Sequence, residues 1–200
     1  MKKSKAQTAE TRRRIVEIAS EAFRRQGIEA TGVAEIMAAA GLTHGGFYRH
    51  FSSKEELVAA AVAMSLEQLV LQSERAAEQG AEAALNHALE YLSPLSRDDV
   101  EHSCTFAATA SELVRADGRT RHVASEAFRR TLEGLAPFMC RSQCADQTSA
   151  AISMLTNMIG ALTMARLVDD PVLSDRILAV TRQRLIKSIR TAASRDRRIS

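Results

Sequence analysis

The helical spacing of apolar residues constrains the fold of this chain more than any other feature. Between residues 9 and 26, five apolar side chains fall at i, i+3, i+4, i+7 and i+8, namely Ile15, Ile18, Ala19, Ala22 and Phe23. This spacing places them on one face of a helix. Beyond residue 80 the chain shows no convincing alternation of apolar and polar residues, the pattern of half-buried strands. The sequence therefore predicts an all-α fold with about nine helices.

Glycines, prolines and capping residues mark the expected helix ends. Gly27 and Gly41 are expected to end the first two helices, and Thr31 and Thr43 are plausible N-caps of the second and third. Ser53 and Glu56 have the spacing of a capping box, which predicts a long fourth helix to about residue 79. Further helices are expected at about 81–93, 104–116, 119–142, 146–167 and 172–193, with a kink near Pro137 and a helix start at Pro171.

Residues 31–50 predict a helix-turn-helix, two short helices joined by a Gly-Leu turn. The second of these helices contains the adjacent glycines Gly45 and Gly46, which together cost about 2 kcal/mol relative to alanine in a helix interior. We expect them to let the backbone approach the floor of a DNA groove.

Composition and charge exclude several classes of protein. The chain is 46% hydrophobic, enough for a buried core, but it lacks a run of about 18 uncharged apolar residues, so we expect a soluble, cytoplasmic protein with no membrane span. Its three cysteines form no CxxC pair, and neither a metal site nor a cofactor is expected. Residues 1–54 carry ten basic and five acidic side chains, which leaves a net charge of −2 on the remainder of a chain with +3 overall. This asymmetry favours a polyanion partner at the N-terminal end, although Lys2, Lys3 and Lys5 are equally consistent with a solvated arm.

The last two expected helices have broad apolar stripes, which include Met154, Leu155, Met158, Leu162, Leu178 and Leu185. Burial within one subunit explains such stripes as well as a homodimer interface does.

Two blocks of sequence, residues 31–37 and 40–57, resemble the N-terminal domain of the TetR family of transcriptional regulators. The resemblance rests on the glycine after the first helix, the Ala-Gly turn, the Gly-x-x-Tyr-x-His-Phe block and the Ser-Lys-Glu-x-Leu start of the next helix, all in the family's order. It implies a DNA-binding domain at 8–68, with the helix-turn-helix at about 31–50, and a helical effector-binding and dimerisation domain at 69–200.

The resemblance further implies a homodimer that represses transcription and leaves a palindromic double-stranded operator when a small molecule binds. The implied DNA-binding residues are Thr31, Thr43, His44, Gly45, Gly46, Tyr48, Arg49, His50 and Lys54. His44 and Arg49 are the best placed for base readout, although Arg49 can equally bind a phosphate. Gly46 stands where the family often has a small side chain that reaches a base, which puts base reading there in doubt.

The second half of the chain contains no catalytic constellation, so we do not expect an enzyme. Plausible lining residues of an effector pocket are Met64, Leu92, Cys104, Phe106, Phe128, Met154, Asn157 and Met158, although residues of these types are more often part of the core. An alternative is a thiol-based sensor of oxidants or electrophiles, since Cys104 is expected at a helix start, where the helix dipole lowers a thiol pKa. A nonspecific nucleoid protein is a third possibility.

Overall fold

The computed structural model describes residues 5–139 and 147–196, which form nine α-helices and one 3-10 helix. Within these ranges the chain contains no strand, so the expected all-α class is confirmed. Four of the residues discussed above, Lys2, Lys3, Cys140 and Cys144, lie outside the described ranges.

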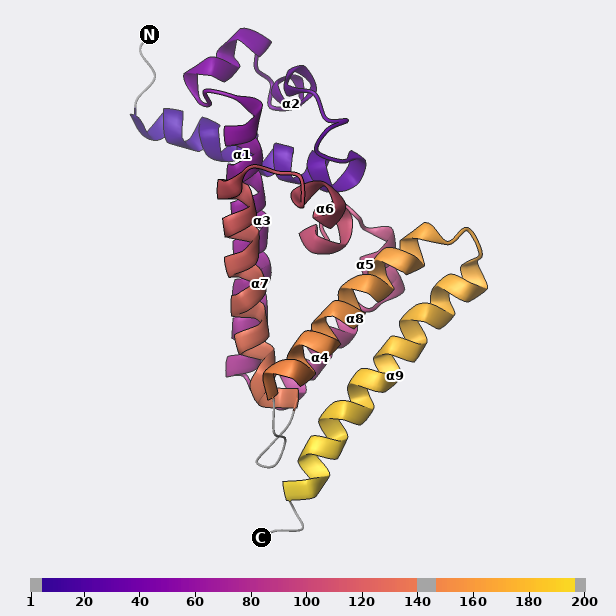
Figure 1. Ribbon diagram of the computed structural model, residues 1–200. Coiled ribbons are helices and arrows are strands. Elements are labelled where there is room, and N and C mark those ends of the chain that lie inside the picture. The colour runs from indigo at the N-terminus through magenta and orange to yellow at the C-terminus, as the bar shows by residue number, and fades with distance from the viewer. Residues whose placement is uncertain (1–4, 140–146, 197–200) are drawn as a thin grey trace.

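The N-terminal helices carry the smaller of the two expected domains. Their bounds are α1 Lys5–Gln26, α2 Val33–Ala39, the 3-10 helix η1 His44–Arg49 and α3 Lys54–Glu78. In Figure 1, α1 and α2 lie at one end of the molecule, where α3 begins, and the C-terminus lies at the other end. The third helix expected from the sequence is thus a 3-10 helix, and α3 starts where the capping box predicted.

The remaining helices form the body of the protein. They are α4 Ala81–Tyr91, α5 Pro94–Asp98, α6 Thr105–Leu113, α7 Gly118–Met139, α8 Gln147–Leu167 and α9 Pro171–Asp196. Five of them match the expected helices, whereas the sequence did not predict the short helix α5. Pro94 is the first residue of α5, where its missing N–H costs nothing, and the Ser93 hydroxyl caps the helix by accepting from Ser96 N at 3.1 Å.

Local chemistry accounts for the main helix boundaries. Gly27 and Gly41 follow α1 and α2 with φ of 93° and 70°, left-handed values that favour glycine over any residue with a side chain. At the start of α3 the Ser53 hydroxyl accepts from Glu56 N at 3.3 Å. The Glu56 carboxylate in turn accepts from the backbone N–H of Ser52 at 2.7 Å. These bonds satisfy donors that the first turn of a helix leaves open.

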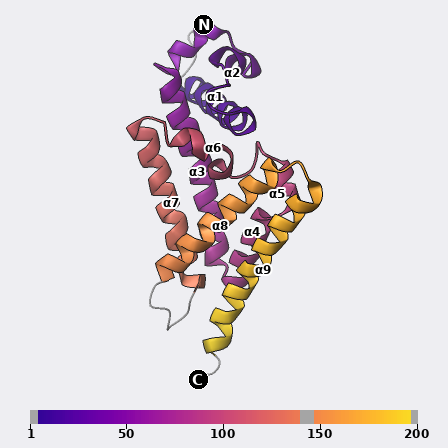
Figure 2. The same ribbon diagram turned by 45° about the vertical axis from the view of Figure 1, so that its right-hand side comes forward.

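Two clusters of buried apolar side chains hold the helices together. The first is built mainly from α1, α2, η1 and the first half of α3, and it also takes in Leu113 of α6 and Ala127 of α7. The second is built from α4, α6, α7, α8 and α9. Helices α3 and α7 run side by side, as do α8 and α9 (Figures 1 and 2). Because α3 continues without a break through residue 68, the expected domain boundary falls inside a helix.

Helix α8 is the one described helix that is long and apolar enough to cross a membrane by length and composition alone. Several of its apolar residues, including Met154 and Leu162, are buried in the second cluster.

Candidate functional site

The segment η1 turns a compact set of polar and aromatic side chains toward solvent. Phe47 and the following Phe51 are each 2% exposed and stack on each other with ring centroids 5.6 Å apart. They anchor the segment to α1, α2 and α3, and so fix which side of η1 faces outward. The exposed side carries Thr43, His44, Gly45, Tyr48 and Arg49.

Tyr48 is the most prominent side chain of this surface. Its side chain is 67% exposed to solvent, although it carries a large aromatic ring. Its ring makes edge contacts with Phe47, at 5.3 Å between centroids, and with His44, at 6.3 Å. These contacts hold the ring in place while the hydroxyl stays in solvent. A rigid ring with a free hydroxyl is suited to donating a hydrogen bond to a phosphate oxygen.

The two glycines of η1 differ in their surroundings. A Cβ added to Gly45 would meet no atom within 4 Å, whereas one added to Gly46 would lie 3.6 Å from Cε of Met37 and 3.8 Å from the hydroxyl of Thr43. Neither has the left-handed φ that would demand glycine. Gly45 therefore leaves open space on the outer surface, and Gly46 faces partly inward onto α2.

Thr31 does not lie on this surface. Its side chain is fully buried, and its hydroxyl donates to the carbonyl of Gly27 at 2.6 Å. Gly32, not Thr31, is the N-cap of α2, and no side chain caps that helix. The two expectations for this residue are therefore corrected: Thr31 ties the end of α1 to the start of α2, and its side chain is not available to DNA in this conformation.

His50 and Lys54 flank η1 on its C-terminal side. His50 is half-buried and ends the 3-10 helix, with its backbone N–H donating to the carbonyl of Phe47 at 2.8 Å. The Lys54 ammonium donates to the carbonyl of Glu29 at 3.2 Å, which places it beside the connector between α1 and α2. Both lie close in sequence to the exposed side of η1.

Two arginines of α1, Arg12 and Arg13, form ion pairs with acidic side chains of the protein. Arg12 forms an ion pair with Glu56 at 2.8 Å and lies over the Phe51 ring, 4.1 Å from its centroid. Arg13 pairs with Glu10 and Glu17 along its own helix. The positive charge available to a polyanion is therefore smaller than the count of basic residues, and Arg12 chiefly braces the start of α3 against α1.

A polar seam joins the end of α1 to the loop between α5 and α6. The Arg24 guanidinium donates to the backbone carbonyl of Glu101 at 2.5 Å, and Arg25 pairs with the Glu101 carboxylate at 2.9 Å. Nearby, the Glu112 carboxylate of α6 accepts from the backbone N–H of Glu29 at 2.9 Å. These contacts connect the N-terminal helices to the body of the protein independently of α3.

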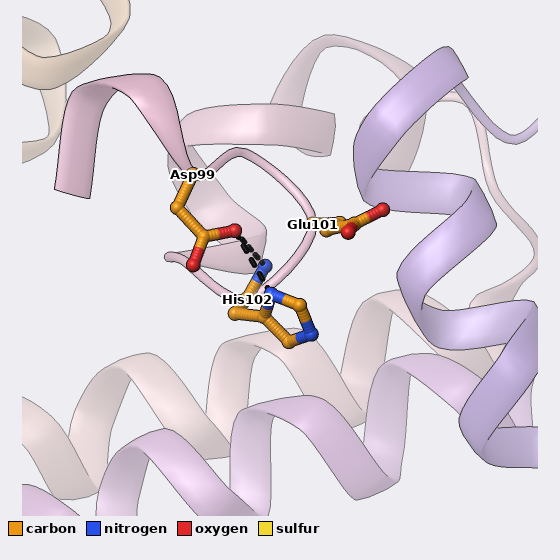
Figure 3. Close-up of side chains that lie close together, drawn as sticks. All are labelled: Asp99, Glu101 and His102. Atoms are coloured by element: carbon orange, nitrogen blue, oxygen red, sulfur yellow. Dashed lines mark hydrogen bonds and ion pairs between the residues drawn. The ribbon is translucent and has the colours of Figure 1, made fainter. Parts of the chain in front are cut away.

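The same loop holds a small cluster of ionisable groups. The backbone N–H and Nδ1 of His102 both donate to the Asp99 carboxylate, and Figure 3 shows these two side chains facing each other while Glu101 points away from them. Asp99 raises the pKa of His102 through this hydrogen bond. Asp99, Glu101 and His102 offer ligand atoms within 4.8 Å of one another, but Glu101 is engaged by Arg25, and the three side chains lie at the surface or near it. We therefore assign these three residues to the polar seam and not to a metal site.

A largely apolar, partly open chamber of about 70 Å³ lies in the body of the protein between α3, α4, α6, α7 and α8. Of the eight expected lining residues, Cys104, Phe106 and Met158 face it. Leu92 and Met154 belong to the buried core, Met64 packs on the first cluster, and Phe128 makes an edge contact with Phe106 at 5.7 Å. Asn157 lies on the exposed side of α8, where its amide donates to the carbonyl of Ser153, so its expected place in the pocket lining is wrong.

Sequence reasoning missed two of the polar residues that line the chamber, His87 and Tyr91 of α4. They are four positions apart and so share one helix face, a signal that the sequence does contain. Burial lowers the pKa of His87, which favours its neutral form, and the ring lies 3.4 Å from the hydroxyl of Ser73. The Tyr91 hydroxyl is buried and has no well-aligned hydrogen-bond partner among the described residues.

Cys104 is the N-cap of α6 and a buried residue. Burial raises the pKa of its thiol, and this effect exceeds the opposing influence of Tyr91, of the backbone N–H groups of α6 and of Arg166. The expectation that the helix start lowers this pKa is therefore wrong, because removal from water disfavours the thiolate more than the helix start favours it.

Comparison with known proteins places this geometry in a family. Residues 15–61 match the model of bacterial regulatory proteins of the tetR family. The chain is 42% identical over 60 residues to the HTH-type transcriptional regulator TtgR of Pseudomonas putida, a match that covers 30% of this chain and 29% of that protein. It is 41% identical over 56 residues to the regulator AcrR of Shigella flexneri, covering 28% and 26% of the two chains. The matches thus span less than a third of the length of these curated relatives.

Solved structures extend the likeness to the whole chain at the level of the fold. The reduced form of Escherichia coli NemR superposes with a TM-score of 0.77 at 16% identity, covering 90% of this chain and 97% of that one. A TetR regulator from Legionella pneumophila gives a TM-score of 0.75 at 18% identity, covering 94% and 98%. A complex of SmeT with triclosan gives 0.63 at 22% identity, covering 89% and 90%. Residues 15–61 are therefore similar to the DNA-binding region of tetR-family bacterial regulatory proteins, and about nine-tenths of the chain shares the fold of solved TetR-family regulators.

Proposed function

We propose that this protein is a soluble, cytoplasmic and non-enzymatic homodimer that represses transcription by binding a palindromic operator, and that a small molecule releases it from DNA. The single observation that carries the DNA-binding part is the outward side of η1, where Thr43, His44, Tyr48 and Arg49 are exposed over a rigid phenylalanine base. We divide the chain as the sequence predicts, into a DNA-binding domain at 8–68 and a sensing and dimerisation domain at 69–200.

On DNA, η1 enters the major groove with its exposed side toward the bases. Tyr48, His50 and Lys54 then bind phosphates and set the register of the protein. Thr43, His44 and Arg49 are left for base edges, with the Arg49 guanidinium matched to guanine O6 and N7. Gly45 gives the backbone room to approach the groove, since no atom of the protein lies above it.

A dimer is needed to read a palindrome, and the exposed apolar side chains of the last two helices supply its interface. Six of them lie on α8 and α9: Ile152, Met164, Leu167, Val172, Leu173 and Val180. Packing against a second copy would remove this apolar surface from water. The two η1 segments would then lie about 34–36 Å apart, one turn of DNA.

The dimer can be tested by placing charge in this interface. A Met164→Glu, Val180→Glu double variant should be monomeric at micromolar concentration, because two carboxylates per subunit would have to be buried unpaired. Sedimentation velocity measures the change, and far-UV circular dichroism checks that the helices remain. A variant that sediments as the wild-type dimer would place the interface elsewhere.

Release by an effector follows from the way the sensing half meets the N-terminal helices. Cys104 faces the chamber and lies directly after the loop that carries Glu101, whose contacts with Arg24 and Arg25 hold the end of α1. An effector that displaces this loop would therefore change the angle at which the DNA-binding domain is held. Triclosan bound to the structural relative SmeT shows that a protein of this fold accepts a small aromatic molecule.

Fluorescence anisotropy with labelled DNA tests the proposed function. The purified protein should bind the intergenic DNA upstream of its own gene at least about a hundredfold tighter than a scrambled duplex, within the usual range for specific binders. Affinity should fall steeply between 50 and 200 mM salt as counterions are released from the phosphates. Equal affinity for both duplexes would indicate a nonspecific nucleoid protein, and no binding at low salt would remove the DNA-binding proposal.

A further inference from the structure

Two hollows with different chemistry share one wall in the sensing half. The first is the apolar chamber described above. The second is an open groove of about 860 Å³ that runs along α3 and α4 to the loop before α6. Both are lined by Leu69, His87, Tyr91 and Cys104, so these four residues form the boundary between them. The two hollows are therefore adjacent, and a ligand that displaces these side chains would extend from one hollow into the other.

The chamber suits an apolar group of modest size. Its wall consists mainly of leucine, phenylalanine, methionine and alanine side chains from five helices. At about 70 Å³ it is smaller than a cavity of about 150 Å³ that binds benzene, so one ring requires a small outward shift of the wall. Gly134 of α7 lies in that wall, and a Cβ added there would meet no atom within 4 Å.

The groove has the opposite character. Its lining is rich in side-chain amides and hydroxyls, among them Gln68, Gln72, Gln79, Asn86, Ser93 and Ser96. Its permanently charged residues balance, since Arg24 and Arg75 are matched by Glu90 and Asp99, and the remaining ionisable side chain near the loop, His102, is hydrogen-bonded to Asp99. A surface of uncharged donors and acceptors with no net charge favours a neutral, hydrogen-bonding group over an anion or a cation.

The boundary between the hollows offers one unsatisfied donor. The Tyr91 hydroxyl is buried there beside the Cys104 thiol, a weak hydrogen-bond partner, and it has no well-aligned nitrogen or oxygen partner among the described residues. A ligand oxygen at the junction would accept from it. His87, the other polar residue of the wall, is already paired with Ser73 and adds no charge in its neutral form.

From this arrangement we infer that the effector is an uncharged molecule in two parts: an aromatic or short aliphatic group for the chamber, joined through an oxygen atom to a hydroxyl- or amide-rich group for the groove. This inference rests on the proposed function, since it describes the small molecule that releases the repressor. Arg24, Asp99 and His102 of the polar seam also line the groove, so the polar part of such a ligand reaches the contacts that hold the DNA-binding domain.

Four small probes separate the two compartments. Isothermal titration calorimetry on the full-length protein would compare phenyl β-D-glucopyranoside, which has both parts, with phenol, methyl β-D-glucopyranoside and phenyl phosphate. We expect the phenyl glucoside to bind at least about tenfold tighter than each of the other three, because it alone fills both hollows without bringing a charge. Phenol binding as tightly as the glucoside, phenyl phosphate binding more tightly, or no measurable binding by any probe would each overturn the inference.

Variants assign each part of the probe to its compartment. Gly134→Leu fills the chamber with a good helix former and should weaken both phenol and phenyl glucoside at least about tenfold, whereas the matched control Gly134→Ala should change either by less than about threefold. Gln72→Leu in the groove should weaken the glucoside several-fold and leave phenol unchanged. Equal losses of both probes in Gln72→Leu, or no loss in Gly134→Leu, would show that the ligand does not span the two hollows.

Operator binding by the same preparation keeps the two proposals distinguishable. If the protein binds its upstream DNA but shows none of the expected probe preferences, the effector inference is wrong and the proposed function stands. If the protein binds no DNA at low salt, the proposed function is wrong whatever the probes do.

Discussion

Replacement of Tyr48 by phenylalanine isolates one atom of the proposed DNA-binding surface. The ring is held by Phe47 and His44, and the side chain is 67% exposed, so the hydroxyl contributes little to the folded state. The free energy of unfolding of Tyr48→Phe should therefore lie within about 0.5 kcal/mol of the wild-type value, as is usual for surface changes. Urea denaturation followed by circular dichroism measures this difference.

The effect on DNA binding should be much larger. A hydrogen bond to a charged group contributes about 1.5–3 kcal/mol, and a dimer makes one such bond with a phosphate in each half-site. At the lower limit the two bonds contribute about 3 kcal/mol, which corresponds to a loss of about 150-fold in affinity. Because phosphate contacts carry no sequence information, affinity for scrambled DNA should fall as well.

Fluorescence anisotropy at fixed salt provides the assay, and the only other tyrosine provides the control. Tyr91 lies in the sensing half, so Tyr91→Phe should bind the operator as the wild type does. The reasoning is refuted if Tyr48→Phe keeps an operator affinity within twofold of wild type. It is also refuted if Tyr91→Phe loses as much affinity, since the loss would then not arise at the DNA surface.

Further predictions concern helix ends and pH. Gly27→Ala should lower the free energy of unfolding by about 1–2 kcal/mol because φ there is 93°, while Gly45→Ala, in open space and without a left-handed φ, should raise it by up to about 1 kcal/mol; thermal and urea unfolding compare the two. The pKa of His102 is raised above its ordinary 6.5 by Asp99, so its contribution to stability is present below pH 6.5 and is lost as the pH rises through the folded-state value. Burial lowers the pKa of His87 below 6.5, so stability is lost as the pH falls below that value. His102→Gln and His87→Gln should therefore change the pH profile of stability in opposite directions, and parallel shifts would contradict these assignments.

The predictions made from the sequence were most accurate for helix caps and helix ends, which depend on residues close together in the chain. The capping box at Ser53 and Glu56, the left-handed glycines Gly27 and Gly41, and the start of α9 at Pro171 all lie where the sequence placed them. In each case the deciding interactions join residues no more than four positions apart. The Asp170 carboxylate, for example, accepts from Val172 N at 2.9 Å and so caps α9 locally.

Predictions failed where a side chain's surroundings come from distant segments. The sequence predicts that Thr31 is an exposed helix cap. In the structure it is buried against α1, and its hydroxyl donates a hydrogen bond to the carbonyl of Gly27. Arg12 is one of the ten basic residues in the N-terminal segment 1–54, but its guanidinium is paired with Glu56, 44 positions later. Asn157 has a polar side chain on an apolar helix, and the packing of α8 turned it outward rather than into a pocket.

The sequence by itself determined the helical class, most helix boundaries and the motif of the DNA-binding domain, because caps, turns and apolar periodicity act over a few residues. The tertiary structure alone decided that η1 exposes Tyr48 above two buried phenylalanines, and that His87 and Tyr91 lie between an apolar chamber and a polar groove. These features depend on which helix faces meet, which is set by packing between segments far apart in the chain. The adjacent glycines show both contributions. The sequence alone predicts that they destabilise a helix relative to alanine, but only the packing of η1 on α2 shows that Gly45 faces open space and Gly46 faces Met37.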